Sequence, residues 1–384
     1  MIIKNALVYR ADGHFVKEDI FIKNERFVEE YIPEEGEKVV DAEGCYAIPG
    51  LIDIHFHGAV GYDICDGSME AYEKIADYEL ENGITSICPA TLTLPVEELL
   101  HVLKTGAEFA KQSKGADLVG FNMEGPFISY EKKGAQNEKY IKGCDEELVD
   151  EFLRASEGLV KFVGLAPERN EDFENYIRKV KGKIRVSLAH TNAKYDLAKK
   201  ALDAGACHGV HLYNAMSGFS HRDTGVVGAL SDSPHAFCEI ICDGIHVTPS
   251  AVRAAMRLMG KDRMVLVSDS LRSTGMPDGI YMLGGQEVEK KGSSCCLVKG
   301  GNLAGSVTNL RDCMKNVVKT MEIPLETAIQ CATLNAAKSI GIDKDYGSIE
   351  IGKFADVVLL KQSEDLDLVG VIKRGREVKK SLRP

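Results

Sequence analysis

The chain has 384 residues, of which 44% are hydrophobic and 27% charged, and its formal net charge is −11. This length and composition fit one large barrel or two domains, and they exclude a disordered or fibrous chain. Because no long run of Lys and Arg offsets the negative charge, the composition argues against a nucleic acid or an anionic membrane as a partner.

We expect no membrane-spanning or targeting segment. No apolar stretch of about 18 residues is present, and the first residues, MIIKNALVYRADG, lack the apolar core of a signal peptide. The 11 cysteines form no C-x-x-C pair, so we expect reduced and mostly buried thiols. These features predict a cytoplasmic protein.

Short alternating runs at both ends of the chain predict a small β domain. MIIKNALVYR, EDIFIKNERFVEEYI and CYAIPG lie at the start, and the stretch from IGKFADVVLL onward has the same pattern. We expect residues 1–49 and 348–384 to pair into one small β-sandwich domain. Residues 50–347 would then form the larger domain.

Eight apolar runs without alternation occupy this larger domain, as in strands that are buried on both faces. They lie at residues 50–58, 83–93, 117–127, 159–168, 184–192, 209–216, 236–247 and 263–270. Helical patterns follow several of them, which predicts the βα repeat of a TIM barrel. A doubly wound open sheet is the alternative, but no G-x-G-x-x-G follows the first run. Residues 275–301 are rich in Gly and predict an insertion or flap.

Titratable side chains follow the predicted strands at their ends. In IDIHFH, strand alternation would place Asp53, His55 and His57 on one face, which in a barrel is the inner face. The later runs end near Glu124, His190, His211, His246 and Asp269. Active sites of TIM barrels lie at this rim, and imidazoles with carboxylates are ligands of zinc, iron and related divalent ions. The pattern predicts a hydrolytic metal site.

These residues lie in motifs that resemble the N-acetylglucosamine-6-phosphate deacetylases of the amidohydrolase superfamily. The resemblance covers nearly the whole chain, through PGLIDIHFHG, EGPF with KKGAQ, LAPE, AHTNA, HLYNAM, DGIHV, LVSD and GSIEIGKFADVVLL. HLYNAM and DGIHV are specific to the deacetylases. The opening H-x-H and the closing GKFADVV are shared widely in the superfamily.

The resemblance implies a role for each motif residue. Glu124, His190 and His211 would be the principal metal ligands, and His55 with His57 would hold a second ion, giving one or two ions per subunit. Zn²⁺ is the expected metal, with Fe²⁺ or Mn²⁺ as alternatives. Asp269 would be the general base for the attacking water and the acid for the leaving amine.

The implied substrate is a phosphorylated N-acetylhexosamine. Its predicted contacts are Gln136, Asn214, Ala215, Arg222 and His246. Arginine suits the phosphate because its planar fork donates two parallel hydrogen bonds. The resemblance also implies a homodimer with a shared phosphate site.

Several alternatives stay open at this point. Gln136 stands where many relatives have a histidine, and a glutamine can donate a hydrogen bond but cannot carry a proton. Lys161 lies on the fourth run, and an inward Lys161 would favour a hydantoinase or dihydroorotase with a carboxylated lysine. Other possible functions are deacetylation of N-acetylgalactosamine 6-phosphate, a D-aminoacylase activity, and a barrel without catalytic activity.

Overall fold

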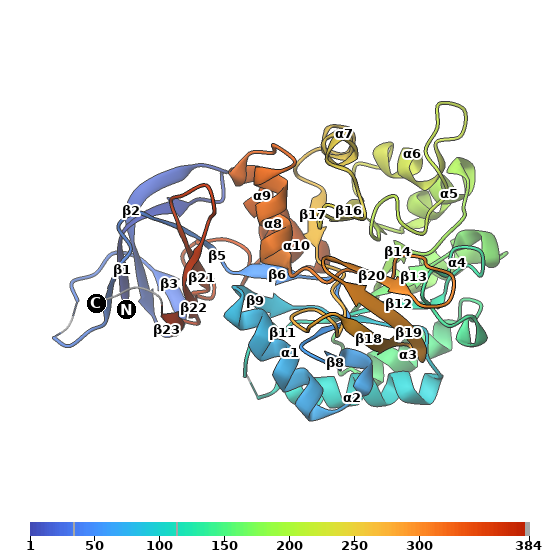
Figure 1. Ribbon diagram of the computed structural model, residues 1–384, viewed down its shortest axis with the longest axis horizontal. Helices are drawn as coiled ribbons and strands as arrows, with labels where there is room; N and C mark the ends of the chain where they lie inside the picture. Colours follow the sequence, from blue (N-terminus) through green and yellow to red (C-terminus); the bar gives the residue numbers. More distant parts are fainter. Residues whose placement is uncertain (34, 113, 381–384) are drawn as a thin grey trace.

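The computed structural model describes residues 1–33, 35–112 and 114–380, and it has a parallel barrel beside a separate sheet (Figure 1). The barrel strands are β6 (Leu51–Asp53), β9 (Ile84–Ile87), β10 (Ala90–Thr91), β11 (Asp117–Leu118), β12 (Phe121–Phe127), β13 (Val160–Leu165), β14 (Arg185–Leu188), β15 (His208–Gly209), β16 (Phe237–Ile241) and β17 (Met264–Val267). They pair in parallel in the orders β11-β9-β6 and β10-β12-β13-β14-β15-β16-β17. Seven of the eight predicted runs contain strands of this barrel, and the run at residues 209–216 overlaps β15 only at Gly209.

The barrel closes where the last strand meets the first. The N–H of Asp269, two residues after β17, donates to the C=O of His55 at 2.9 Å. The second predicted run is divided between β9 and β10, and β10 continues beside β12. The predicted TIM barrel is confirmed.

A helix follows each of the eight strand positions, as a βα barrel requires. The helices are α1 (Met69–Glu81), α2 (Val96–Ala110), α3 (Glu146–Ala155), α4 (Phe173–Val180), α5 (Tyr195–Ala204), α6 (Gly225–Ser231), α7 (Pro249–Met259), α8 (Leu310–Lys319), α9 (Leu325–Ala332) and α10 (Leu334–Ile340). Single turns of 3₁₀ helix lie at η1 (Ile64–Asp66), η2 (Glu138–Tyr140) and η3 (Pro167–Arg169). None of the helices in the described part of the chain is long and apolar enough to cross a membrane.

Helix α1 shows how the sequence builds these units. It begins after Ser68, whose Oγ accepts a hydrogen bond from the Ala71 N–H at 3.2 Å. This cap satisfies a backbone donor that has no partner inside the helix. Ile75 and Leu80 lie on the buried face, and the helix packs beside β9.

Apolar side chains from facing strands define the inside of the barrel. They include Ile52 and Ile54 of the first strand region, Phe162, Ile241, Val265 and Val267, and they meet Ala336, Ala337 and Ile340 of α10. Asp53 follows Ile52 within β6 and its side chain is therefore on the opposite face of the strand. The prediction that Asp53 shares a face with His55 and His57 is wrong, because β6 ends at Asp53 and strand alternation does not continue beyond it.

The two chain ends form the separate sheet. Its strands are β1 (Ile2–Tyr9), β2 (Phe15–Lys23), β3 (Arg26–Val28), β4 (Val39–Asp41), β5 (Cys45–Pro49), β21 (Val357–Lys361), β22 (Leu368–Lys373) and β23 (Arg376–Lys380). The order is β23-β22-β21-β5-β1-β2-β3, with β4 beside β1, and antiparallel β5 and β21 join the two ends. The predicted small β domain from both ends is confirmed.

This sheet has a core of its own. Ile3 and Val8 of β1, Ile22 of β2, Ala47 of β5 and Val357 of β21 belong to one buried cluster, which means that the sheet curls around it. The exact boundaries at residues 49/50 and 347/348 stay a prediction. At the seam with the barrel, Arg374 donates to Asp117 Oδ2 of β11 at 2.9 Å.

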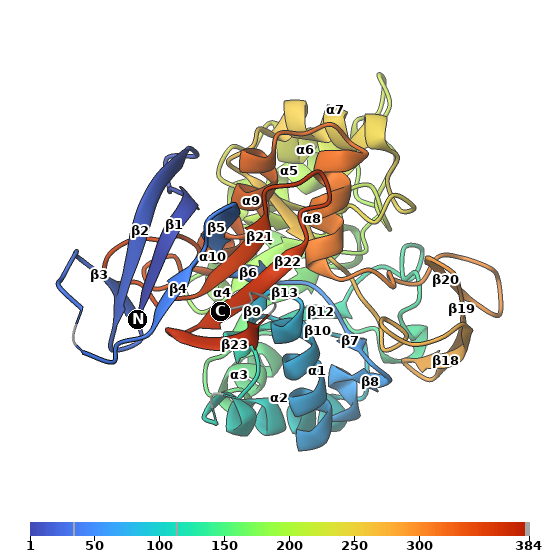
Figure 2. The ribbon, with the colours of Figure 1, turned by 60° about the vertical axis from the view of Figure 1, so that its left-hand side comes forward.

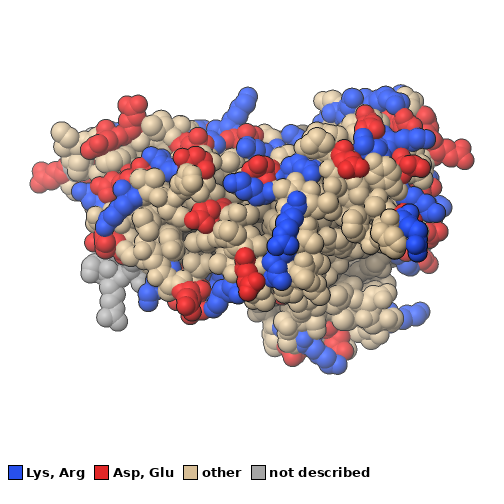
Figure 3. All heavy atoms as spheres, turned by 90° about the horizontal axis from the view of Figure 1, so that it is seen from above, with Lys and Arg blue, Asp and Glu red and all other residues tan. Residues whose placement is uncertain are grey.

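The predicted insertion is a three-stranded antiparallel sheet of β18 (Gly279–Leu283), β19 (Gln286–Lys291) and β20 (Ser294–Leu297). Figure 2 shows it standing out to one side of the barrel. A short hairpin of β7 (Gly58–Ala59) and β8 (Tyr62–Asp63) lies on the loop after β6. On the face shown in Figure 3, Lys and Arg are interspersed with Asp and Glu, and neither sign covers a continuous area.

Candidate active site

The predicted metal ligands and the predicted base meet at one rim of the barrel. Glu124 lies within β12, and the others follow β6, β14, β15 and β17: His55, His57, His190, His211 and Asp269. His190, His211 and Asp269 have positive φ angles of 45°, 31° and 50°. Such angles are uncommon outside glycine, and here they turn the chain out of the strand at the rim.

Three of these side chains form a tight cluster. Nε2 of His190 lies 2.9 Å from Glu124 Oε1, Nε2 of His211 lies 3.1 Å from the same oxygen, and the two nitrogens are 3.2 Å apart. Ligand atoms that bind zinc tetrahedrally at ordinary bond lengths lie about 3.4 Å from one another. The separations therefore suit three ligands of a single ion.

A second group lies beside the first. Nε2 of His57 is 3.3 Å from Asp269 Oδ1 and 3.5 Å from Glu124 Oε2. Nε2 of His55 lies 3.3 Å from Glu124 Oε1 and 3.8 Å from Asp269 Oδ1. Two sets are therefore close enough to hold a metal ion, namely His55 with Glu124 and His211, and His55 with His57 and Asp269.

Hydrogen bonds to Nδ1 orient the imidazoles. Nδ1 lies 2.7 Å from the Lys132 carbonyl in His190, 3.0 Å from the Asn214 carbonyl in His211 and 3.1 Å from the Ala90 carbonyl in His57. A carbonyl can only accept, so Nδ1 carries the proton and Nε2 keeps its lone pair. Lone pairs and carboxylate oxygens thus face one another, which a cation would stabilise.

The Nε2 atom of His55 is a second observation that favours a cation at this site. It is buried, and it makes no hydrogen bond among the described residues. An unpaired buried polar atom is costly, and a metal ion is one group that would satisfy it. The residues present therefore fit a divalent cation.

The carboxylates of the site are held in their charged form. Burial alone would raise the pKa of Glu124, but the neighbouring imidazoles of His190 and His55 hold it well below its usual range. Burial also acts to raise the pKa of Asp269, and the neighbouring imidazoles of His57 and His55 lower it overall. An ionised Asp269 is the form that a general base requires.

A cavity of about 390 Å³ opens above these groups. Of the predicted substrate contacts, Gln136, Asn214, Ala215 and His246 line it, together with Leu283, Asn302 and Leu303 from the insertion and the loop that follows it. Arg222 does not line this cavity. It lies in an exposed loop beside Lys194 and Tyr195, so one chain does not bring Arg222 to the site and its phosphate role stays a prediction.

Two of the lining side chains are fixed by hydrogen bonds. The Gln136 side chain donates through Nε2 to Glu124 Oε2 and accepts from the Thr93 N–H at 2.6 Å. Gln136 therefore holds the carboxylate of the predicted ligand Glu124 in place, and a direct substrate contact of Gln136 stays a prediction. Nδ1 of His246 lies 2.7 Å from Asp243 Oδ2, which leaves Nε2 available at the cavity.

Lys161 does not support the carboxylated-lysine alternative. It is the second residue of β13, far from the carboxyl end of the strand, and it alternates with Phe162, which faces the barrel interior. The Lys161 Cγ lies only 2.4 Å from where a Cβ on Gly120 would be. Its side chain therefore packs near Gly120, at the end of β13 opposite the rim that carries the candidate ligands.

Sequence reasoning missed Glu239 and His208, which lie beneath the ligands. Glu239 is fully buried on β16 and contacts both His55 and His208. Burial would raise the pKa of Glu239, but its contacts with these two imidazoles lower it to about 2. An acid within the apolar run AFCEII was the available signal.

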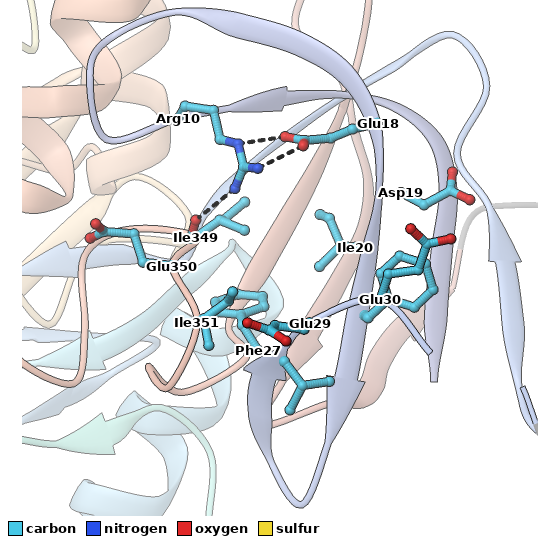
Figure 4. Close-up of a pocket in the computed structure, with 12 residues that line it drawn as sticks. Arg10, Glu18, Asp19, Ile20, Phe27, Glu29, Glu30, Ile349, Glu350 and Ile351 are labelled. Atoms are coloured by element: carbon cyan, nitrogen blue, oxygen red, sulfur yellow. Dashed lines mark hydrogen bonds and ion pairs between the residues drawn. The ribbon is translucent and has the colours of Figure 1, made fainter. Parts of the chain in front are cut away.

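A larger cavity of about 490 Å³ lies in the sheet domain (Figure 4). There Arg10 donates to Glu18 Oε2 at 2.6 Å and to the Ile349 carbonyl at 3.4 Å. None of the predicted ligands or substrate contacts lines it. The smaller cavity at the barrel rim is therefore the candidate active site.

Comparison with known proteins agrees with this site. The sequence model of the Amidohydrolase family matches residues 46–378. The chain is 35% identical over 379 residues to N-acetylglucosamine-6-phosphate deacetylase of Bacillus subtilis, covering 97% of this chain and 93% of that protein. It is 34% identical over 313 residues to N-acetylgalactosamine-6-phosphate deacetylase of Escherichia coli O157:H7, covering 81% and 82%.

Comparison with solved structures gives the same result for the fold. The crystal structure of N-acetylglucosamine-6-phosphate deacetylase from Pasteurella multocida matches with a TM-score of 0.90 at 30% identity, covering 98% of this chain and 99% of that chain. With most of its length matched by the family model, the chain belongs to the amidohydrolase family.

Proposed function

We propose that the chain removes the acetyl group from N-acetyl-D-glucosamine 6-phosphate and releases glucosamine 6-phosphate and acetate. The observation that carries the proposal is the position of Asp269, whose carboxylate lies 3.3 Å from His57 Nε2 beside the ligand cluster at the floor of the cavity. The names of the relatives supply the substrate class.

The metal ligands have separate tasks in this proposal. Glu124, His190 and His211 would hold one divalent ion, and His55 with His57 would hold a second. A bound ion of this kind polarises the amide carbonyl and makes a water molecule more acidic. Zn²⁺ is our choice, and Fe²⁺ or Mn²⁺ suits the same imidazole and carboxylate donors.

Asp269 carries the proton in both halves of the reaction. Its carboxylate takes a proton from the attacking water as the oxygen bonds to the carbonyl carbon. It returns that proton to the sugar nitrogen as the C–N bond breaks, so the amine leaves in neutral form.

The substrate contacts come from the cavity and from a second subunit. Asn214, Ala215 and His246 would hold the sugar phosphate from the same chain. Arg222 would reach the phosphate from the partner in a homodimer, because its own loop lies outside the cavity of its chain. Eleven free cysteines suit a reducing compartment, and we place the protein in the cytoplasm.

A second substrate has a specific observation in its favour. The relative from Escherichia coli O157:H7 is an N-acetylgalactosamine-6-phosphate deacetylase and is nearly as similar as the others. The two sugars differ at one hydroxyl, and discrimination there depends on the placement of a few polar groups.

Acetate release tests both substrates. We would assay N-acetylglucosamine 6-phosphate, N-acetylgalactosamine 6-phosphate and the two unphosphorylated sugars, each with and without a chelator. We expect the highest kcat/KM for the glucosamine derivative and loss of activity in chelator. Comparable turnover of the free sugars, or full activity after metal removal, would contradict the proposal.

A further inference from the structure

Glu239 contacts two predicted metal ligands and a third histidine from inside the barrel. Its Oε2 lies 2.7 Å from His55 Nδ1 and accepts the backbone N–H of His211 at 3.2 Å. Its Oε1 lies 2.8 Å from His208 Nε2. The side chain is fully buried, as is that of His208. A single buried carboxylate on β16 thus links β15 with the histidine that follows β6.

The His55 contact differs from those of the other ligand histidines. Nδ1 of His57, His190 and His211 faces a backbone carbonyl, whereas Nδ1 of His55 faces a carboxylate. A carboxylate is the stronger acceptor, and as an outer partner it raises the basicity of a ligand imidazole. His55 is therefore the ligand whose donor strength depends on another titratable side chain.

His208 completes the arrangement. Its Nε2 supplies the hydrogen bond that Oε1 needs, and its ring lies 4.4 Å from the Phe162 ring between centroids. Its Nδ1 makes no hydrogen bond among the described residues. With Phe162 packed on its ring, His208 acts as a rigid donor to Glu239 and does not reach the cavity.

We propose that Glu239 is a positioning residue for the metal centre, which holds His55 with the proton on Nδ1 and fixes the spacing between His55 and His211. This inference rests on the ligand set proposed above. Without Glu239, the His55 ring would be free to rotate or to change tautomer, and its Nε2 would no longer face Glu124 and Asp269. The ion that depends on His55 would bind more weakly.

Metal binding by Glu239 variants tests this role. Wild-type protein, Glu239→Gln and Glu239→Ala would be stripped, reloaded with Zn²⁺ and titrated with a competing chelator, with His55→Asn as the reference for a lost ligand. We expect a 10- to 100-fold weaker affinity for one ion in the Glu239 variants. We expect Ala to be weaker than Gln, because the Gln oxygen still accepts from His55.

Glu79→Gln is the matched control. Glu79 is also a buried carboxylate, but it lies on α1 and contacts none of the predicted ligands through a hydrogen bond among the described residues. We expect Glu79→Gln to keep wild-type zinc affinity. Wild-type affinity in both Glu239 variants would overturn the inference, as would equal loss in the Glu79 control. A wild-type protein that binds no ion would instead refute the proposed function.

The His55 tautomer gives a readout that needs no Glu239 variant to fold. Long-range ¹H–¹⁵N spectra of metal-free wild-type protein, assigned by the signal missing in His55→Asn, report which ring nitrogen carries the proton. We expect Nδ1 to be protonated and Nε2 to be free. A proton on Nε2 alone would overturn the inference whatever the behaviour of the variants.

Discussion

Asp269 and His55 are joined through the backbone, with the Asp269 N–H donating to the His55 carbonyl at 2.9 Å. The bond lies where the last barrel strand meets the first, and the two side chains meet above it with 3.8 Å between His55 Nε2 and Asp269 Oδ1. Closure of the barrel therefore places the proposed base beside the histidines of the first strand. Residues more than two hundred positions apart share one site for this reason.

Asp269→Asn should remove turnover while the fold persists. The amide cannot take a proton from water, so we expect kcat to fall by about 10²- to 10⁴-fold. Thermal unfolding of the variant should stay close to that of wild type, and at least one zinc ion should stay bound, since Glu124, His190 and His211 remain. Turnover within a few-fold of wild type would reject Asp269 as the base.

Arg222→Ala should weaken binding of the phosphorylated sugar. A lost charged hydrogen bond corresponds to about a 10- to 100-fold rise in KM, with little change for the unphosphorylated sugar. Steady-state kinetics on both sugars measure this difference. An unchanged preference for the phosphorylated sugar would exclude the phosphate role and leave Lys132, which lines the cavity, as a cation within reach.

Mixing two variants tests whether Arg222 acts across a dimer. In a mixed dimer of Arg222→Ala and Asp269→Asn, one site has an intact base and receives Arg222 from the other subunit. We expect refolded mixtures to recover low-KM activity that neither variant has alone. Recovery would fail if Arg222 served its own chain or if the protein were monomeric.

His55→Asn should cost no more than one ion per chain. Glu124, His190 and His211 keep their mutual contacts without His55, because their Nδ1 and Oε partners lie elsewhere. Metal analysis after reloading with Zn²⁺ should therefore show at least one ion still bound. Complete loss of metal would show that the two ligand groups are not separable.

Asp356 should make stability depend on pH. It lies at the seam of the two domains, accepts the Arg374 N–H at 2.8 Å, and burial raises its pKa from 3.8 to about 6. The folded state thus binds a proton between pH 4 and 6 that the unfolded state does not, and the free energy of unfolding gains up to about 3 kcal/mol as pH falls through this range.

Asp356→Asn removes this proton. Denaturant unfolding at several pH values should give the variant a flatter dependence than wild type from pH 7 to pH 4, with wild type gaining relative to the variant as pH falls. Groups that titrate alike in wild type and variant contribute equally to both curves, so the difference between the curves reports Asp356 alone. Parallel curves would show that Asp356 has the same pKa in the folded and unfolded states.

The barrel, and the meeting of most candidate site residues at its rim, could be predicted from the sequence because both depend on local patterns. Apolar runs without alternation mark strands buried on both faces, and a histidine or acid at the end of such a run lies at the rim. The prediction failed for Asp53 because the point where β6 ends is not encoded in alternation. The prediction also placed Arg222 at the substrate phosphate, but within one chain Arg222 lies outside the candidate active-site cavity.

Glu239 and His208 show a second limit. Each is a polar residue inside or beside a short apolar strand, and a core position with a satisfied hydrogen bond is the usual interpretation of such a residue. Their function depends on contacts between β6, β15 and β16, which are distant in the chain. For Lys161, the sequence predicted the strand correctly, but it did not predict the direction in which the side chain points.

The most direct test of the account is anomalous X-ray diffraction from crystals grown with Zn²⁺, recorded on both sides of the zinc absorption edge. We predict an anomalous peak within bonding distance of Glu124, His190 and His211, with any second peak beside His55 and His57. Zinc bound elsewhere on the chain, with these five side chains free of metal, would contradict it.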